Sequence, residues 1–225
     1  MAKTKWASVT SHENLGDGVT RIHCLADNDL LHVAGNYVIL RSTVPNPEKP
    51  GEVLKRAYSI SSAPDPENPR SFHFTIVDVG ETSSWLSQRE QGDRVEFSGP
   101  WGKKFRAKPD DPEVPVHLIA TGTGFSPIGA MAVDRSRTGG LPVTVWWQTV
   151  HDYDQDVVNA LRSNERFSIH IGSSVVDEVP PESNALYFLA GDGAVIVPLC
   201  EKLSANGVPK ENIRTELFFN KPPKS

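Results

Sequence analysis

Cysteine is scarce in this chain of 225 residues, which contains only Cys24 and Cys200. Two thiols cannot supply the four ligands of a Cys-only zinc site or of an iron–sulfur cluster, so we expect no such metal centre. A disulfide framework is excluded as well. We therefore expect a reducing, cytoplasmic setting.

Long hydrophobic runs and an excess of positive charge are also missing. The apolar stretches, such as 143–147 and 185–190, are far shorter than the roughly 20 residues of a membrane helix. No apolar run follows the first residues, as it would in a signal peptide. The formal net charge is −5, which disfavours broad binding to a phosphate backbone. We expect neither membrane insertion nor nucleic-acid binding.

The first half of the chain has the rhythm of short strands separated by Gly, Pro, Asn and Asp. This pattern predicts an antiparallel barrel or sandwich, because strands recur at short intervals with turn residues between them. One short helix is expected at 83–90. The expected strands are 19–25, 36–41, 55–60, 72–79 and 93–98.

The second half alternates apolar strands with amphipathic helices, which is typical of a parallel α/β sheet. The proline-containing segment 109–115 is expected to be a linker between the halves. We therefore expect a barrel domain at 1–110 and an α/β domain at 111–225. The expected strands are 116–121, 143–149, 167–171, 185–190 and 213–218, and the expected helices are 127–137, 155–164 and 194–206.

A glycine-rich turn connects the first of these strands to its helix. Gly122, Thr123 and Gly124 stand where backbone amides and a helix N-terminus can approach a pyrophosphate. The turn departs from the usual dinucleotide pattern, because Pro127 stands where a third glycine would be. The alternative interpretation is a tight turn with no ligand.

Two further motifs are weak when each is taken alone. Arg56, Ala57, Tyr58 and Ser59 would put a phosphate-binding fork, a flat ring and a hydroxyl on one strand, although the four residues alone favour an ordinary strand with a surface arginine. The segment from Gly80 through Thr82 and Ser83 could bind phosphate at a helix start or could simply cap the helix.

In this order, the motifs resemble those of the ferredoxin–NADP reductase superfamily over almost the whole chain. The resemblance implies an N-terminal antiparallel Greek-key β-barrel that binds FAD and a C-terminal parallel-sheet domain that binds NADH or NADPH. The matching segments are Gly35-Asn36-Tyr37, Arg56-x-Tyr58-Ser59, Gly80-x-x-Ser83-x-x-Leu86, Gly99-Pro100-Trp101-Gly102, Thr121-Gly-Thr-Gly124-x-x-Pro127, Leu189-Ala190-Gly191-Asp192-Gly193 and 206–218.

The resemblance also implies roles in the barrel. Arg56 would bind the flavin pyrophosphate, Tyr58 would stack on the isoalloxazine, and Ser59 would hydrogen-bond the ring nitrogen that accepts hydride. Ala57 lies within the same motif. Contacts to the adenosine half and to phosphate are implied for Phe74, Thr75, Ile76, Thr82 and Ser83.

In the second domain, the resemblance implies a nicotinamide pocket and an acid near the flavin, which is Glu216. Phe218 or Phe219 would cover the ring, or else bury the last strand. Tyr58, Ser59 and Glu216 are the implied catalytic residues. The nucleotide would be bound by Thr121, Gly122, Thr123, Gly124, Pro127, Gly191 and Asp192.

The chain departs from the family pattern at two places. Ala190 replaces a cysteine that lies beside the nicotinamide in relatives, and Asp192 adds a negative charge there. Many relatives have Gly-x-Arg after the second strand, where this chain has Gln148-Thr149-Val150. A 2′-phosphate needs a nearby cation, so we expect NADH rather than NADPH unless Arg162, or Arg135 and Arg137, reach it.

The function implied by this resemblance is that of a flavin-dependent NAD(P)H oxidoreductase. Its electron acceptor would be a separate protein, a ferredoxin or other small redox protein. A basic set could dock an acidic partner or could simply be solvated. Its members are Lys55, Arg56, Lys103, Lys104, Arg106 and Lys108. The alternatives are a flavoprotein subunit with weak or lost NAD(P)H oxidation and a reductase of the ferric-siderophore type. FMN remains an alternative to FAD.

Overall fold

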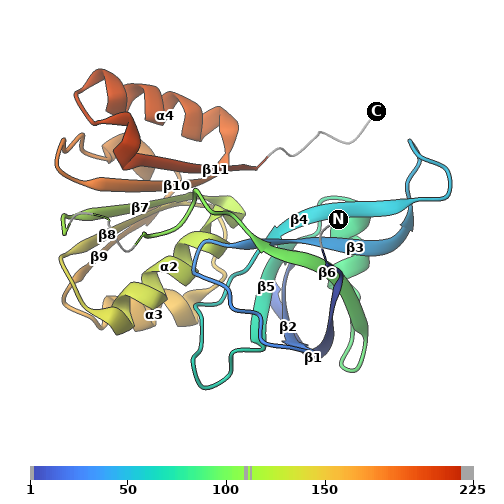
Figure 1. The fold of residues 1–225 in the computed structure, drawn as a ribbon. Coiled ribbons are helices and arrows are strands. Elements are labelled where there is room, and N and C mark those ends of the chain that lie inside the picture. The colour runs from blue at the N-terminus through green and yellow to red at the C-terminus, as the bar shows by residue number, and fades with distance from the viewer. Residues whose placement is uncertain (1–2, 109–110, 112, 219–225) are drawn as a thin grey trace.

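The structure, a computed structural model, describes residues 3–108, 111 and 113–218. Two sheets lie side by side, an antiparallel one from the first half of the chain and a parallel one from the second (Figure 1). This arrangement confirms the predicted fold class. The predicted division between 110 and 111 falls beside residues 109, 110 and 112, which lie outside the described residues, so the domain boundary stays a prediction.

The antiparallel sheet has six strands in the order β4-β3-β6-β1-β2-β5. The two end strands meet through the segment after β4. The amide of Ser61 donates to the carbonyl of His73 (2.9 Å), and the hydroxyl of Ser61 accepts from the amide of Thr75 (2.8 Å). This contact closes the sheet into a barrel. The strands are β1 (Lys5–Gly16), β2 (Val19–Ala26), β3 (Tyr37–Pro45), β4 (Val53–Ser59), β5 (Ser71–Val77) and β6 (Arg94–Trp101), with helix α1 (Glu81–Ser87) between β5 and β6.

The parallel sheet has five strands in the order β11-β10-β7-β8-β9. Its strands are apolar because both faces are covered, by α2 and α3 on one side and α4 on the other (Figure 1). Successive tryptophans show this alternation, since Trp147 packs under α2 and α3 and Trp146 packs on the α4 side. The elements are β7 (Val116–Thr121), η1 (Gly122–Gly124), α2 (Phe125–Thr138), β8 (Val143–Gln148), α3 (Gln155–Arg162), β9 (Phe167–Gly172), η2 (Val175–Glu178), β10 (Leu186–Asp192), α4 (Gly193–Ala205), η3 (Lys210–Asn212) and β11 (Ile213–Phe218).

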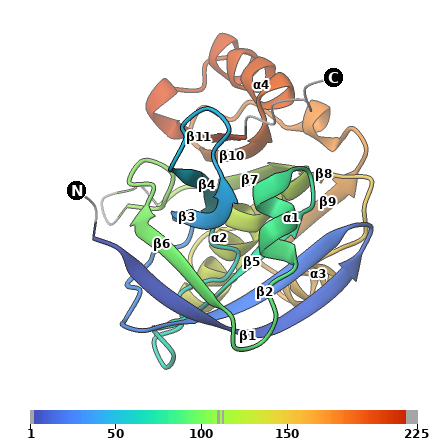
Figure 2. The same cartoon turned by 90° about the vertical axis from the view of Figure 1, so that its right-hand side faces the viewer.

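The carboxyl edge of the parallel sheet faces the barrel (Figures 1 and 2). Val19, Ala34 and Phe105 of the barrel belong to the same buried cluster as the core under α2. Gly35, at φ +91°, lies so close to Met131 that a Cβ atom there would overlap the methionine methyl group. The hydroxyl of Ser126, at the start of α2, reaches the carbonyl of Thr75 on β5 (3.4 Å). The two sheets are therefore packed against each other through side chains.

Most expected elements lie within two residues of their observed bounds, and four differ more. The strand expected at 36–41 extends to Pro45 as β3, and the strand expected at 93–98 extends to Trp101 as β6. The expected helix at 83–90 is α1 at Glu81–Ser87, because it begins directly after Gly80 and ends before Gln88. The long strand β1 has no counterpart among the expected strands, because Ala7 and Val9 are its only buried residues and its second half is polar. No helix in the described part of the chain is long and apolar enough to cross a membrane.

Candidate functional site

The edge strand β4 carries the first group of predicted site residues. Lys55, Arg56 and Ala57 are exposed one after another, whereas Tyr58 and Ser59 are half-buried. Within the described residues, Arg56 makes one hydrogen bond, from Nη1 to the carbonyl of Lys55 (2.9 Å). Its other N–H groups are therefore available to an anion. The strand presents this donor beside a half-buried ring, which suits a flat ligand that carries phosphate.

The ring of Tyr58 packs edge-on to Phe74, with 6.0 Å between the ring centroids and 62° between the planes. Burial raises the pKa of the Tyr58 phenol, so it stays protonated as a hydrogen-bond donor. Phe74 and Ile76 lie in the core of the barrel. Their contacts with adenosine stay predictions.

Thr75 points the other way, toward the parallel sheet. Its hydroxyl donates to the Asp154 carboxylate (3.4 Å), and its carbonyl accepts from Ser126 (3.4 Å). Its side chain is buried. The structure thus shows Thr75 at the junction of the two sheets, a position that the sequence does not reveal.

The turn before α1 is closed by one hydroxyl. Ser83 Oγ accepts from the amides of Val79 (3.0 Å) and Gly80 (2.9 Å) and donates to the Gly80 carbonyl (2.8 Å). Thr82 and Ser83 are both buried. The Ser83 hydroxyl therefore binds the backbone that leads into α1, and phosphate binding at this turn stays a prediction.

The glycine turn after β7 is packed against the end of β10. Gly122 has φ +50°, a conformation that favours glycine, whereas Gly124 touches the Ala190 carbonyl so closely that a Cβ atom would overlap it. The hydroxyl of Thr121 accepts from the amide of Asp192 (2.7 Å). Two segments of the carboxyl edge, 121–124 and the end of β10 at 190–192, thereby form one unit.

Gly122 and Thr123 are half-buried and form the outer surface of this unit. The other predicted residues of the turn, Thr121, Gly124 and Pro127, are buried beneath it. The carboxylate of Asp192 accepts from the amide of Ala194 (2.9 Å) and caps α4. The interpretation of Asp192 as an added negative charge is therefore incomplete, since part of its role is structural.

Glu216 and Phe218 lie on β11 beside this unit. In the parallel register Ala190 stands opposite Glu216, and Asp192 stands opposite Phe218. Burial raises the pKa of Glu216 to about 7. The structure therefore brings Glu216 and Phe218 together with Thr121, Gly191 and Asp192 at one edge. Phe219 lies outside the described residues.

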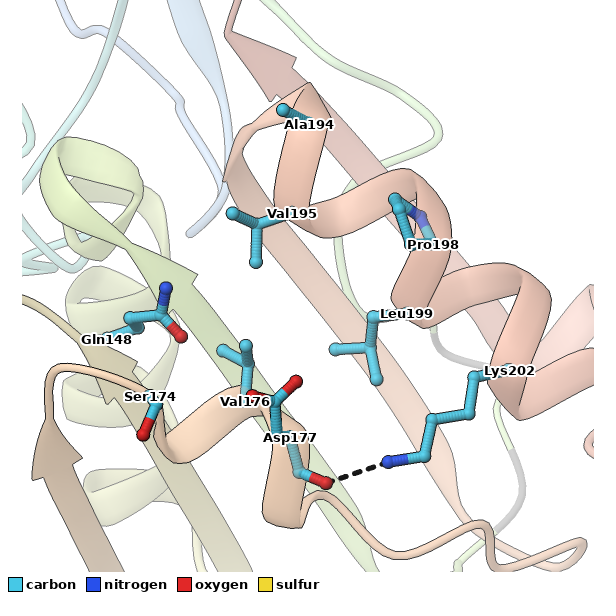
Figure 3. A pocket seen from close by; sticks show the side chains of 9 residues that line it. All are labelled: Gln148, Ser174, Val176, Asp177, Ala194, Val195, Pro198, Leu199 and Lys202. Carbon is cyan, nitrogen blue, oxygen red and sulfur yellow. Dashed lines mark hydrogen bonds between the residues drawn. The ribbon is translucent and has the colours of Figure 1, made fainter.

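A cavity of about 330 Å³ opens at the same edge, between the end of β8, η2 and α4 (Figure 3). Gln148 lines it, and the side-chain oxygen of Gln148 is buried with no hydrogen-bond partner among the described residues. Opposite, Lys202 donates from Nζ to the carbonyl of Asp177 (2.7 Å). The volume of the cavity lies within the range of small-molecule sites. Ser174, Asp177 and Lys202 were missed from the sequence, although all line the cavity. Ser174 follows β9 at the carboxyl ends of the strands, where ligands bind, whereas Lys202 lies in the last turn of α4, at the far end of the lining.

The arginines considered for a 2′-phosphate lie elsewhere. Arg135 and Arg137 are in the last turn of α2, and the carbonyl of Arg135 accepts from Arg166, just before β9 begins. Arg162 is in the last turn of α3, which also leads into β9. All three therefore lie toward the amino edge of the sheet, away from the cavity.

Comparisons with known proteins agree with this geometry. The family described as "Oxidoreductase FAD-binding domain" matches residues 8–105. A ferredoxin–NADP reductase B from Sorangium cellulosum is 34% identical over 109 residues, which are 48% of this chain and 43% of that protein. Residues 8–105 therefore match an FAD-binding oxidoreductase domain, and the chain is similar to ferredoxin–NADP reductases.

Two further reductases extend the comparison. A ferredoxin–NAD(P)(+) reductase, CarAd, from Metapseudomonas resinovorans is 28% identical over 191 residues, covering 76% of this chain and 56% of that protein. The cytochrome P450 reductase GcoB from Amycolatopsis has the same fold, with a TM-score of 0.81 and 20% identity over 96% of this chain and 70% of that one. The chain spans about half the length of the two curated reductases that it matches.

The FAD named by the matching domain family fits the residues that are present. The test is Arg56, whose guanidinium has no acidic partner among the described residues and stands two residues from the half-buried Tyr58. A cation that is not neutralised by the protein is what a pyrophosphate requires. The ring of Tyr58 has the partial exposure that stacking requires.

Proposed function

We propose that this chain is an FAD-dependent NAD(P)H reductase that passes electrons to a separate acceptor, a ferredoxin or other small redox protein. The observation that carries the proposal is the carboxyl edge of the parallel sheet, where the glycine turn lies beside β5 of the barrel and Ser126, directly after the turn, reaches the Thr75 carbonyl. Ligands of parallel sheets bind at this edge, so a nucleotide there would face a flavin on the barrel. The proposed division is a flavin domain at 1–110 and a nucleotide domain at 111–225.

The flavin, when bound, supplies the chemistry: it takes up a hydride from the reduced nicotinamide and releases the two electrons singly. The residues of the chain bind and orient the reactants. We assign Arg56 to phosphate, Tyr58 to stacking and Ser59 to a hydrogen bond with the ring. Gly122 and Thr123 supply the exposed surface of the nicotinamide side. Glu216, which is half protonated near pH 7, is suited to holding a proton beside the ring.

The cavity of Figure 3 is assigned to the adenosine half of the nucleotide. The unpartnered oxygen of Gln148 would accept a hydrogen bond from a ribose hydroxyl or an adenine amino group, and a phosphate has no such donor to offer. Lys202 is the cation of this lining, but its amine already donates to the Asp177 carbonyl, and the Asp177 carboxylate is close by. This chemistry supports NADH over NADPH.

The acceptor would dock on the basic set around β4 and the segment after β6. Of the six residues in this set, Arg106 is half-buried and the other five are exposed. No ion pair joins any of the six to an acidic residue in the described part of the chain. Unneutralised cations near the flavin strand favour an acidic partner.

The test is an anaerobic titration of the purified chain reconstituted with FAD. We expect a yellow protein whose flavin absorbance is bleached by NADH at lower concentration than by NADPH, and is restored by an oxidised acidic ferredoxin. A colourless protein that cannot be reconstituted would refute the proposal. A bound flavin that neither nucleotide reduces would instead identify the alternative, a flavoprotein subunit without nucleotide oxidation. Turnover with ferric chelates and not with ferredoxin would identify a siderophore-type reductase.

A further inference from the structure

A buried ion-pair cluster joins the barrel to the parallel sheet. Arg21 on β2 donates from Nη2 to Asp154 Oδ1 (2.6 Å) and holds Asp156 with both Nη atoms (3.0 and 2.9 Å). The side chains of Arg21 and Asp154 are 8% and 6% exposed. Arg21 comes from the first half of the chain, and Asp154 and Asp156 come from the second. Among the described residues to which a cofactor role is assigned, only Thr75 forms a hydrogen bond with this cluster, to Asp154.

The Asp154 carboxylate binds Arg21 and does not cap the helix that follows it. Asp154 precedes α3 as the N-cap residue, but its carboxylate makes no capping bond. Its backbone is left-handed (φ 56°, ψ 27°), a conformation that non-glycine residues seldom adopt. The carboxylate is thereby turned toward Arg21 and Thr75 across the junction. Strained residues of this kind persist where the surroundings require a particular side-chain direction.

Burial raises the pKa of Asp154 and so acts against its charge, whereas the hydrogen bond from Arg21 lowers the pKa of Asp156. Burial disfavours the charged form of Arg21, but its hydrogen bonds and charge interactions with Asp156 and Asp154 outweigh that effect and hold its pKa above the usual value. A guanidinium that binds carboxylates through several N–H groups fixes both distance and angle. The apolar contacts of Val19 and Phe105 at the same junction carry no such direction.

The cluster also connects the two proposed binding regions. Asp154 stands six residues after Gln148, which lines the cavity. Arg21 lies opposite Thr75 in the register of β2 and β5, and β5 leads into the turn that Ser83 closes. A shift at the ion pair would therefore move the nucleotide side relative to the flavin side.

We propose that Arg21, Asp154 and Asp156 form a positioning latch that sets the parallel sheet against the barrel at the separation at which nucleotide and flavin react. The inference rests on the proposed function. Arg21 and Asp154 are positioning residues, because they act through the placement of the two domains and touch neither reactant.

The test compares Arg21→Met, Asp154→Asn and Asp156→Asn with a matched control, Arg94→Met. Arg94 forms a two-bond pair with Asp27 (2.8 and 2.6 Å) within the barrel, so its loss removes an Arg–Asp pair without touching the junction. We expect the limiting rate of flavin reduction at saturating NADH to fall about tenfold or more in Arg21→Met and Asp154→Asn, because small misplacements of reactants are costly. In the same two variants, the dissociation constant for the nucleotide should stay within about twofold of the wild-type value. In Arg94→Met, the limiting rate of flavin reduction should also stay within about twofold of the wild-type rate.

A second readout does not depend on activity. Spin labels at Thr10 on β1 and Glu201 on α4, both exposed, report the distance between the sheets in a cysteine-free background without flavin. We expect one narrow distance for the parent and Arg94→Met, and a broadened distribution for Arg21→Met and Asp154→Asn. Lower thermal stability with unchanged distances and an unchanged limiting rate would overturn the latch.

The variants keep the two proposals separable. If Arg21→Met does not fold, Asp156→Asn decides, since the Asp156 side chain is 63% exposed and should show the same effects at smaller size. If neither nucleotide reduces the parent flavin, the proposed function fails, while the label distances still support or overturn the latch.

Discussion

The backbone of Gly124 lies so close to Ala190 that a Cβ atom at Gly124 would overlap the Ala190 carbonyl group. The contact is between two main chains, so no side-chain movement can relieve it. We expect Gly124→Ala to destabilise the fold by about 3 kcal/mol, in the upper range for overpacking. Thermal or urea unfolding measures this. Gly193→Ala is the matched control, because a Cβ atom at Gly193 would meet nothing within 4 Å, and an unfolding midpoint that falls equally in both variants would contradict the explanation.

Removal of the Arg56 side chain is expected to weaken flavin binding without unfolding the barrel. Hydrogen bonds to charged groups contribute about 1.5–3 kcal/mol, so the FAD dissociation constant of Arg56→Met should rise about 10- to 100-fold. Fluorescence of released flavin measures it. Arg41→Met, on the neighbouring strand, removes another exposed arginine of the barrel. Equal flavin loss in both variants would count against a specific role for Arg56.

Glu216 should make the stability of the fold depend on pH. Burial raises its pKa from 4.5 to about 7. At pH values between these two, the folded state keeps the Glu216 proton, whereas the unfolded state has released it. The stabilisation is fully present below about pH 4.5 and is lost as pH rises through about 7. We expect Glu216→Gln to be more stable than the parent at about pH 8, by about 1 kcal/mol after allowance for the partial exposure of this group. Melting temperatures at about pH 5 and about pH 8 measure this, with the exposed Glu211→Gln as control.

A cation placed after β8 should increase the use of NADPH. Val150 is exposed and lies two residues beyond Gln148 of the cavity lining. Because an arginine binds a phosphate through paired charged hydrogen bonds, Val150→Arg should lower the KM for NADPH about tenfold and leave that for NADH nearly unchanged. Val150→Gln provides a neutral side chain of similar reach. If it improves NADPH use as much as the arginine does, charge is not the cause.

The sequence predicted the elements well because their signals are local. The strands β7 to β11 are apolar runs, and the helices between them begin or end beside turn residues such as Gly124, Asp154 and Asn206, so their periodicity is visible in a short window. β1 has no such signal, since only Ala7 and Val9 are buried along it. It is a strand because β2 and β6 pair with it, and β6 lies far along the chain.

The site was predictable to the extent that short motifs carry it. Arg56, Tyr58 and the glycine turn were found because each combines a residue type with a recognisable neighbour. The pairing of Arg21 with Asp154 spans 133 residues, and neither residue has an unusual neighbour in the sequence. The contact of Gly124 with Ala190 is equally remote from any local signal. Such relationships arise from the packing of distant segments on one another, which no local pattern encodes.

The place of β6 in the barrel bears on how the protein folds during its synthesis. β6 lies between β3 and β1, so until residue 101 leaves the ribosome both of those strands have an open edge. Open edges readily pair with other chains. Translation that slows before β6 would prolong this vulnerable stage, and faster delivery of the segment 94–101 would shorten it.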